Sequence, residues 1–216
     1  MTLEEVKSNL QITEFLKMSK KHLGLYHFTD HGIDHANLVA DRALEIGKKI
    51  GLTKKEQELS SIAAYVHDMG NFLSRENHEY WGSILFHNIF QDKNPKDIVS
   101  IMQAIANHDN YDSKIVNKIA AVVILADKSD VRRSRVMEKD MQNIRRYIHN
   151  RVNYAATNTK LIIKDKRITL KLEIDTKFVP LIEYFEIFTE RMIQCRKAAE
   201  YLGYKFALVI NNFKLL

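Results

Sequence analysis

The stretch that decides the fold is AAYVHDMGNF, residues 63–72, in which an apolar run ends at two adjacent titratable residues, His67 and Asp68. The run has the character of a buried helix, and Gly70 and Asn71 after it are typical of a helix end. Adjacent side chains near a helix end diverge by about 100°. The pair therefore cannot point at one atom along a regular helix. Gly70 lets the backbone turn directly after the pair.

The composition predicts a soluble protein built as one domain with an appendage. The chain has 216 residues, of which 45% are hydrophobic, enough to bury a substantial core. Cys195 is the single cysteine, which excludes an internal disulfide and a cysteine metal cluster and fits a reducing cytoplasm. No run approaches the roughly 18 apolar residues that a membrane span needs. We therefore expect a cytoplasmic protein, and its net charge of +6 favours anionic ligands.

Helical periodicity covers most of the chain, and only seven glycines and two prolines interrupt it. The segment IDHANLVADRALEIGKKIG predicts an amphipathic helix that Asp34 caps and Gly51 ends. We expect helices at about 3–19, 33–51, 54–68, 78–91, 96–108, 113–150 and 178–203.

Residues 159–176 differ, because Ile168, Leu170, Leu172 and Ile174 alternate with polar residues after a KDK turn. The alternation predicts a β-hairpin. Its apolar face is covered either by the closing helix at 178–203 or by a second subunit, since an isolated hairpin is marginal in water. We favour the first option, with the hairpin as a flap beside a cleft, and a homodimer remains the alternative. The predicted organisation is a helical domain at 1–150 and a hairpin with its closing helix at 151–216.

Histidines gather near the predicted helix ends. A single histidine there is more often a cap or a satisfied core group, so the argument rests on the ordered set: His35, His67 with Asp68, His78, His108 and Asp127. Imidazole and carboxylate together suit Fe, Mn, Zn or Ni, and the absence of thiolates argues against a closed structural zinc site.

At these residues the sequence resembles the HD superfamily of metal-dependent phosphohydrolases. That family has a histidine, an adjacent His–Asp pair and a later aspartate on separate helices, matched here in GIDHANLVADRAL, AAYVHDMGN and AVVILADKSD. The resemblance spans about residues 27–135. Members that hold two metals add two histidines, matched by His78 in ENHEYWGSILF and His108 in MQAIANHDN. The resemblance implies a mainly α fold, an HD-domain helical bundle, with six metal ligands: His35, His67, Asp68, His78, His108 and Asp127.

The resemblance implies hydrolysis of a phosphoester or phosphoanhydride by metal-bound hydroxide, with His67 and Asp68 as the catalytic pair. The cofactor is two divalent ions, Fe or Mn first and Zn, Ni or Mg as alternatives. Relatives that open cyclic di-GMP have lysine where this chain has Asn71, and a Gly-Tyr-Pro element that is missing here. The HD-type dinucleoside-tetraphosphate hydrolases are more similar in the region of AIANH and ADKSDVRRSR. The expected substrate is therefore a small phosphorylated compound, a nucleotide or a dinucleoside polyphosphate.

Three further residues are candidates for binding the substrate: Lys128, Arg135 and His31. If the segment after Asp127 is helical, Arg135 lies about 80° from that aspartate around the helix. His31 stands four residues before His35. His87 is the alternative to His78 as a metal ligand, because the spacing from His67 to His78 is short compared with the related enzymes. Asp30 and Asp109 are interpreted as capping or surface residues.

Two other functional classes stay open. The chain can be a nucleotide-sensing or nucleic-acid-binding module, with the hairpin and the basic segment RRYIHNR as its binding surface. It can also be a purely structural helical scaffold, which leaves the ordered histidines unexplained. Because all six ligand candidates are present, we favour an enzyme and do not expect a nucleic-acid partner.

Overall fold

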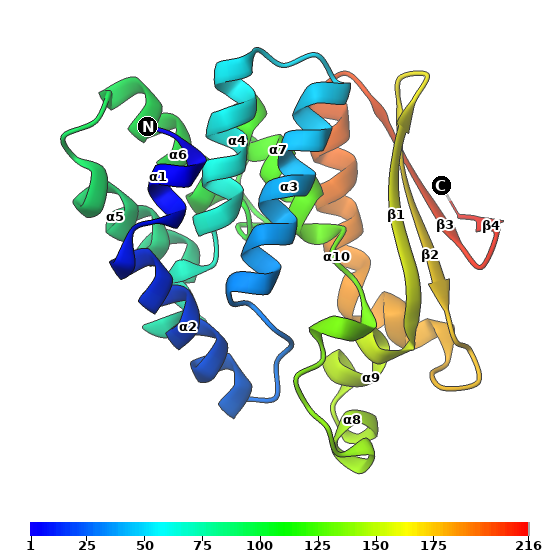
Figure 1. Ribbon diagram of the computed structural model, residues 1–216. Coiled ribbons are helices and arrows are strands. Elements are labelled where there is room, and N and C mark those ends of the chain that lie inside the picture. Colours follow the sequence, from blue (N-terminus) through cyan, green and yellow to red (C-terminus); the bar gives the residue numbers. More distant parts are fainter. Residues whose placement is uncertain (216) are drawn as a thin grey trace.

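Helices form most of the computed structural model, which describes residues 1–215, and a small sheet follows near the C-terminus (Figure 1). The helices are α1 Leu3–Lys7, α2 Leu10–Leu25, α3 Ile33–Lys49, α4 Lys54–Val66, α5 His78–Phe90, α6 Pro95–Asn107, α7 Lys118–Lys128, α8 Met141–Arg146, α9 Ile148–Ala155 and α10 Leu181–Tyr201. Two short 3₁₀ turns are η1 Met69–Phe72 and η2 Arg133–Arg135, and the strands are β1 Ala156–Lys164, β2 Arg167–Ile174, β3 Lys205–Ile210 and β4 Phe213–Lys214. The predicted mainly α fold with a small C-terminal hairpin and closing helix is confirmed.

Local capping residues set several helix ends. The Thr53 side chain accepts from the Glu56 amide while the Glu56 carboxylate accepts from the Thr53 amide, which closes a capping box at the start of α4. The Asn9 side chain caps α2, so the single helix predicted at 3–19 is two helices. The expected stop at Gly51 is confirmed by its φ of 78°. Asp34 lies in the first turn of α3 rather than at its N-cap.

The helix predicted at 113–150 is wrong. In its place are α7, η2, α8 and α9; residues 111–117 before α7 are not helical, and residues 129–140 between α7 and α8 are irregular apart from η2. The Arg135 guanidinium donates to the main-chain carbonyls of Asp30 and Asp130, which holds the second segment in a non-helical path. The Asp140 side chain then caps α8. Helix periodicity alone missed these long-range bonds.

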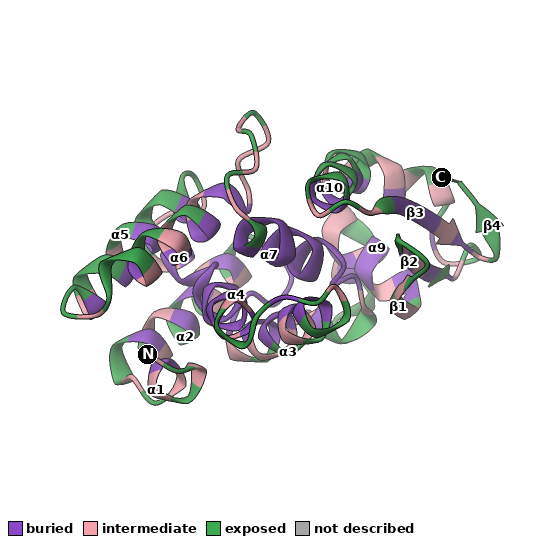
Figure 2. Ribbon diagram, turned by 90° about the horizontal axis from the view of Figure 1, so that it is seen from above, coloured by how far each residue is buried: buried purple, intermediate pink, exposed green. Residues whose placement is uncertain are grey.

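Helix α7 lies at the centre of the helical part, packed against α3, α4, α6 and α10 (Figure 2). Its residues from Ile119 to Lys128 are all buried. This agrees with the sequence KIAAVVILADK, since a helix that is apolar on every side is stable only in the interior. The C-terminal end of α7, and therefore Asp127, is fixed by neighbours on all sides.

The sheet has the order β1-β2-β3-β4, with β1–β2 and β3–β4 antiparallel and β2–β3 parallel. The four alternating residues from Ile168 to Ile174 are buried, and α10 packs on β2 and β3. The closing helix therefore covers the apolar face of the hairpin within the chain, as favoured. Strand β2 is an inner strand because β3 pairs beside it, and β3 and β4 were not predicted. The buried apolar residues of the sheet and of the helices form one cluster, and the boundary predicted at residue 150 falls inside α9.

Within residues 1–215, every helix is too short or too polar to cross a membrane.

Candidate metal centre

The six predicted ligand residues come from the ends of five helices and meet at one buried place. His35 lies in the first turn of α3, His78 is the first residue of α5, and Asp127 lies in the last turn of α7. His67 and His108 are the C-caps of α4 and α6, and Asp68 follows His67 before η1. All six side chains are buried.

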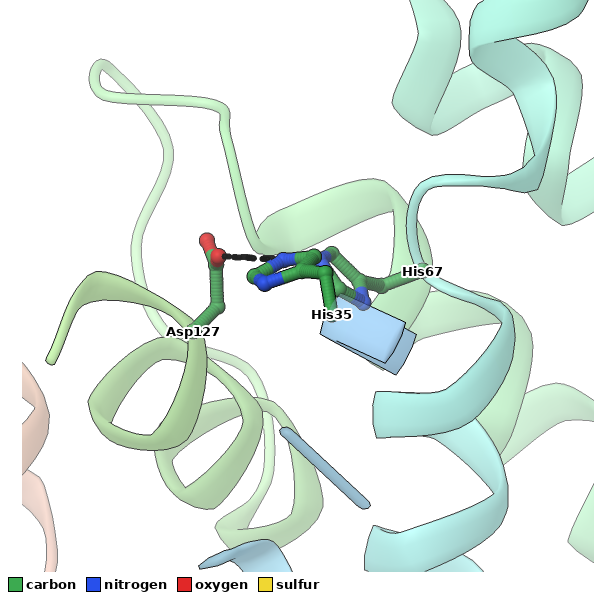
Figure 3. A group of neighbouring side chains, drawn as sticks. All are labelled: His35, His67 and Asp127. Atoms are coloured by element: carbon green, nitrogen blue, oxygen red, sulfur yellow. Dashed lines mark hydrogen bonds and ion pairs between the residues drawn. The ribbon is translucent and has the colours of Figure 1, made fainter. Parts of the chain in front are cut away.

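The first ligand set is formed by His35, His67, Asp127 and one carboxylate oxygen of Asp68. The His35 Nε2 atom lies 3.3 Å from His67 Nε2, 3.3 Å from Asp127 Oδ1 and 3.4 Å from Asp68 Oδ2. His67 Nε2 lies 3.1 Å from Asp68 Oδ2 and 3.6 Å from Asp127 Oδ1. Figure 3 shows both rings and the Asp127 carboxylate side by side.

The second ligand set uses the other oxygen of Asp68. Asp68 Oδ1 lies 3.3 Å from His78 Nε2 and 3.8 Å from His108 Nε2, and the two imidazole nitrogens are 3.2 Å apart. Asp109 Oδ2 approaches the same set at 3.8 Å from His78 Nε2. The two oxygens of one carboxylate therefore approach two separate clusters of donor atoms.

The four imidazole rings are held in a common tautomer by acceptors behind them. His35 Nδ1 lies 2.8 Å from Asp130 Oδ2, whereas the Nδ1 atoms of His67, His78 and His108 lie 2.7 to 3.0 Å from main-chain carbonyls three residues earlier. A ring that donates from Nδ1 keeps the Nε2 lone pair free, and such partners are the usual support of metal-binding histidines. Every Nε2 atom faces the shared centre.

The donor set fits divalent cations. Atoms bound about 2.1 Å from one ion lie roughly 3.0 to 3.4 Å apart in octahedral or tetrahedral coordination, close to the separations found here. Two of the three groups of converging donors among the described residues are made only of predicted ligands: His35, His67 and Asp127, and His67, Asp68 and His108. Imidazole with carboxylate suits Fe, Mn, Zn or Ni.

Comparison with known proteins agrees with this geometry. The sequence model of the HD domain family matches residues 32–150. The chain belongs to the HD domain family. It is also similar to the uncharacterized protein MJ1020 of Methanocaldococcus jannaschii, with 24% identity over 159 residues, which are 62% of this chain and 61% of that protein. The chain thus spans about three fifths of the length of this curated relative.

The electrostatics of the HD site favour charged carboxylates. Burial alone would raise the pKa of Asp68, but the charge of the neighbouring His67 ring holds it well below its usual range. The pKa of Asp127 is likewise well below its usual range because Lys128 and the histidines outweigh burial. Burial opposes the charged form of His67, yet the two carboxylates raise the pKa of His67 to about 10. Without a metal, a proton takes the place of a cation between these groups.

The 3₁₀ turn that follows Asp68 depends on a close backbone approach at Gly70. A Cβ atom at this position would lie 2.1 Å from the His78 carbonyl oxygen and 2.6 Å from the Gly82 amide nitrogen. The turn therefore packs directly on the first turn of α5, which brings His78 to Asp68. The Asn71 side chain donates to Asp68 Oδ1 at 2.9 Å and orients that carboxylate.

Lys128, one of the three predicted substrate-binding residues, is buried in ion pairs. Its Nζ atom lies 2.5 Å from Asp109 Oδ1 and 3.0 Å from Asp127 Oδ2. Its charge is balanced by these two carboxylates. The residue thus fixes the orientation of Asp127 in the HD site.

Arg135 does not lie on a helix with Asp127, so the angular argument for it was wrong. It is buried, and its donors are used by the carbonyls of Asp30 and Asp130. His31 is buried beside His35, with ring centroids 5.6 Å apart, and burial together with the Arg135 charge lowers the pKa of His31 well below its usual value. His31 is therefore uncharged and lies where a substrate contact was predicted.

His87 and Asp30 lie away from the two ligand sets. His87 is on the exposed side of α5, whereas His78 lies beside Asp68. Asp30 is buried, but its carboxylate accepts from the Gly32 amide and pairs with Lys20, which agrees with a capping role.

Sequence reasoning missed two carboxylates of the site, Asp109 and Asp130. Asp109 was interpreted as a surface or capping residue, but it pairs with Arg75 and Lys128 at the second ligand set. The available signal was the dipeptide His108–Asp109, which repeats the His–Asp pair. Asp130 supports His35 and lies three residues after Asp127, but only the tertiary structure brings it behind that ring.

Proposed function

We propose that this protein is a metal-dependent phosphohydrolase that cleaves a phosphoester or phosphoanhydride of a small compound, a nucleotide or dinucleoside polyphosphate. The observation that supports it best is the position of Asp68, whose two oxygens each approach a separate pair of histidines. Two buried donor clusters joined by a carboxylate are the arrangement of a two-metal hydrolytic site.

Each ligand set would hold one divalent ion. The first comprises His35, His67, Asp68 and Asp127, and the second comprises Asp68, His78 and His108 with Asp109 beside them. When bound, such ions supply Lewis-acid activation of a phosphoryl group and lower the pKa of coordinated water. Fe, Mn, Zn or Ni suits this mixed set of nitrogen and oxygen donors, and Fe and Mn are the first candidates.

The protein's own residues would orient the ligands and meet the substrate. Asn71 and Lys128 fix the directions of Asp68 and Asp127, and Asp130 fixes the ring of His35. The uncharged ring of His31 lies beside this centre and can accept a hydrogen bond from the substrate or from water through Nε2, since its Nδ1 faces the Thr29 carbonyl. Burial of the whole set limits access of bulk water.

A screen of phosphate release from nucleotides, dinucleoside polyphosphates and phosphomonoesters, with Mn²⁺ or Fe²⁺ added, tests the proposal. We expect turnover of at least one class, a loss of about 10³-fold or more in Asp68→Ala because a shared ligand is removed, and no loss in Asp34→Ala. Asp34 is an exposed carboxylate on the same helix as His35 and serves as the matched control. Full turnover in Asp68→Ala would reject the proposal.

The alternative is an HD module that binds a nucleotide without turning it over. A complete ligand set argues against it, since a sensor does not need two clusters of donors. Saturable nucleotide binding without phosphate release from any substrate in the screen would favour the sensor.

A further inference from the structure

Arg191 is an arginine on the inward face of α10. The core-facing residues of this helix recur at spacings of four and three: Tyr184, Phe188, Cys195 and Ala198. Arg191 occupies the position of this series between Phe188 and Cys195. Helical geometry therefore directs its side chain toward the body of the protein, although it is only half-buried.

The neighbours of α10 place Arg191 beside the metal centre. One turn further along, Gln194 Nε2 donates to the Asn110 carbonyl at 3.2 Å, so α10 lies against the loop that follows His108. The helix also packs along α7, which ends at Asp127 and Lys128 (Figure 1). The Arg191 guanidinium carbon lies 4.8 Å from the centroid of the Phe188 ring, a cation–π contact that restricts the side chain.

Arg191 differs from the other cations of the site in having no ion pair or hydrogen bond with any residue between 1 and 215. Lys128 and Arg75 are both paired with Asp109, and the donors of Arg135 are used by carbonyls. Burial lowers the pKa of Arg191, but the fields of Asp127, Tyr111 and Asp109 outweigh it and raise the pKa. The guanidinium is thus charged, faces the acidic side of the centre, and keeps its donors free.

We propose that Arg191 forms an anion-binding subsite at the rim of the metal centre and binds oxygens of the substrate's phosphoryl group. The inference rests on the proposed phosphohydrolase function and adds a residue from outside the matched HD segment. A guanidinium presents parallel N–H donors that match two phosphate oxygens, which an ammonium group does not. Because its donors are unused, binding a phosphate breaks no bond within the protein.

His149 indicates where the rest of the substrate lies. Burial, followed by the fields of Arg191 and Arg75, lowers the pKa of His149 to about 4, so the ring is neutral near both guanidinium groups. The ring packs against Phe28, with centroids 5.3 Å apart, and the Arg75 guanidinium lies 6.0 Å from the Phe28 centroid. An uncharged aromatic surface beside the Arg75 guanidinium suits the organic part of a phosphate ester.

Calorimetric titration with inorganic phosphate tests the subsite, using metal-loaded protein and measuring bound metal in parallel. In Arg191→Met we expect the phosphate affinity to fall about 10- to 100-fold, as when one charged hydrogen-bonding partner is removed, with unchanged metal content. Arg191→Lys should recover part of the loss. Arg196→Met is the matched control, because Arg196 is exposed on another face of α10 and should bind phosphate as the wild type does.

Unchanged phosphate affinity in Arg191→Met with metal retained would overturn the proposal, as would a wild type that does not bind phosphate. If Arg191→Met fails to fold, Arg191→Lys provides the test, because its aliphatic chain still packs on Phe188 and only the planar guanidinium is lost. A phosphate affinity equal to that of the wild type in Arg191→Lys then rejects the subsite. The measurement is separate from turnover. If the protein binds phosphate through Arg191 but hydrolyses no substrate, the anion subsite stands and the proposed phosphohydrolase function is rejected.

Discussion

At the scale of single residues, the partner of each histidine Nδ1 atom determines whether the Nε2 atom can bind a metal. His67 and His108 are helix C-caps, where main-chain carbonyls lack intrahelical partners, and each ring bonds the carbonyl three residues earlier. The helix end therefore sets the tautomer. His35 lies in the first turn of α3, and its Nδ1 atom lies 2.8 Å from a carboxylate oxygen of Asp130 instead.

Asp130→Asn tests this supporting role. The amide keeps the shape but removes the negative charge that makes His35 a stronger ligand, so metal affinity should fall about 10-fold. Chelator competition measures the affinity. Asp41→Asn, on the exposed side of α3, should have no effect, and an unaltered affinity in Asp130→Asn would show that the charge is irrelevant.

The raised pKa of His67 predicts how metal binding depends on pH. In the metal-free protein, the ring has a pKa of about 10 against an ordinary 6.5, so its proton stabilises the fold fully below pH 6.5. That contribution is lost as the pH rises through about 10. A metal needs the neutral ring and must displace this proton.

Metal affinity should therefore increase with pH from neutrality to about 10, with net proton release near pH 7.5. Calorimetry in buffers of different ionisation enthalpy measures the released protons. An identical apparent enthalpy in all buffers would contradict the protonated state of His67.

At the scale of elements, the contact between η1 and α5 determines whether the second ligand set forms. A methyl group on residue 70 would overlap main-chain atoms of His78 and Gly82, which cannot rotate away. Gly70→Ala should therefore cost about 3 kcal/mol of unfolding free energy and displace His78 from Asp68.

Denaturant unfolding and metal analysis measure both effects of Gly70→Ala. Gly24→Ala is the control, since a Cβ atom there lies in ordinary contact, 3.5 Å from Met137 Cε, within helix α2. Wild-type stability in Gly70→Ala would mean that η1 and α5 are further apart than described.

The limits of sequence-based prediction also lie at this scale. Helices such as α4 and α6 follow from local periodicity, so their terminal histidines could be placed. The irregular path after α7 depends on Arg135 reaching the carbonyl of Asp30, far away in the chain, and no local pattern contains that bond. The short segment KFALVI forms β3 only because β2 lies beside it. Arg191 was missed because its significance depends on which helix α10 packs against.

At the scale of the whole molecule, the helices and the sheet share one core. Leu170 is fully buried on the inner face of β2, whereas Thr169 lies on the opposite face. Leu170→Ala should cost about 2 to 5 kcal/mol and Thr169→Ala much less. The single tryptophan, Trp81, lies on α5 and reports on the helical part.

If the protein unfolds as one unit, Leu170→Ala shifts the denaturant transition seen by Trp81 fluorescence to the same midpoint as the transition in far-ultraviolet circular dichroism. A Trp81 transition that stays at the wild-type midpoint would indicate that residues 1–150 and 151–216 are separate folding units.

The number of metal ions bound per chain tests the central claim most directly. Protein purified without a histidine tag, loaded anaerobically with Mn²⁺ or Fe²⁺ and desalted, should contain about two ions per chain by elemental analysis. His108→Ala should retain about one, because His35, His67, Asp68 and Asp127 still form the first set, and His87→Ala should retain both. One ion or none in the wild type, or two in His108→Ala, would contradict the account.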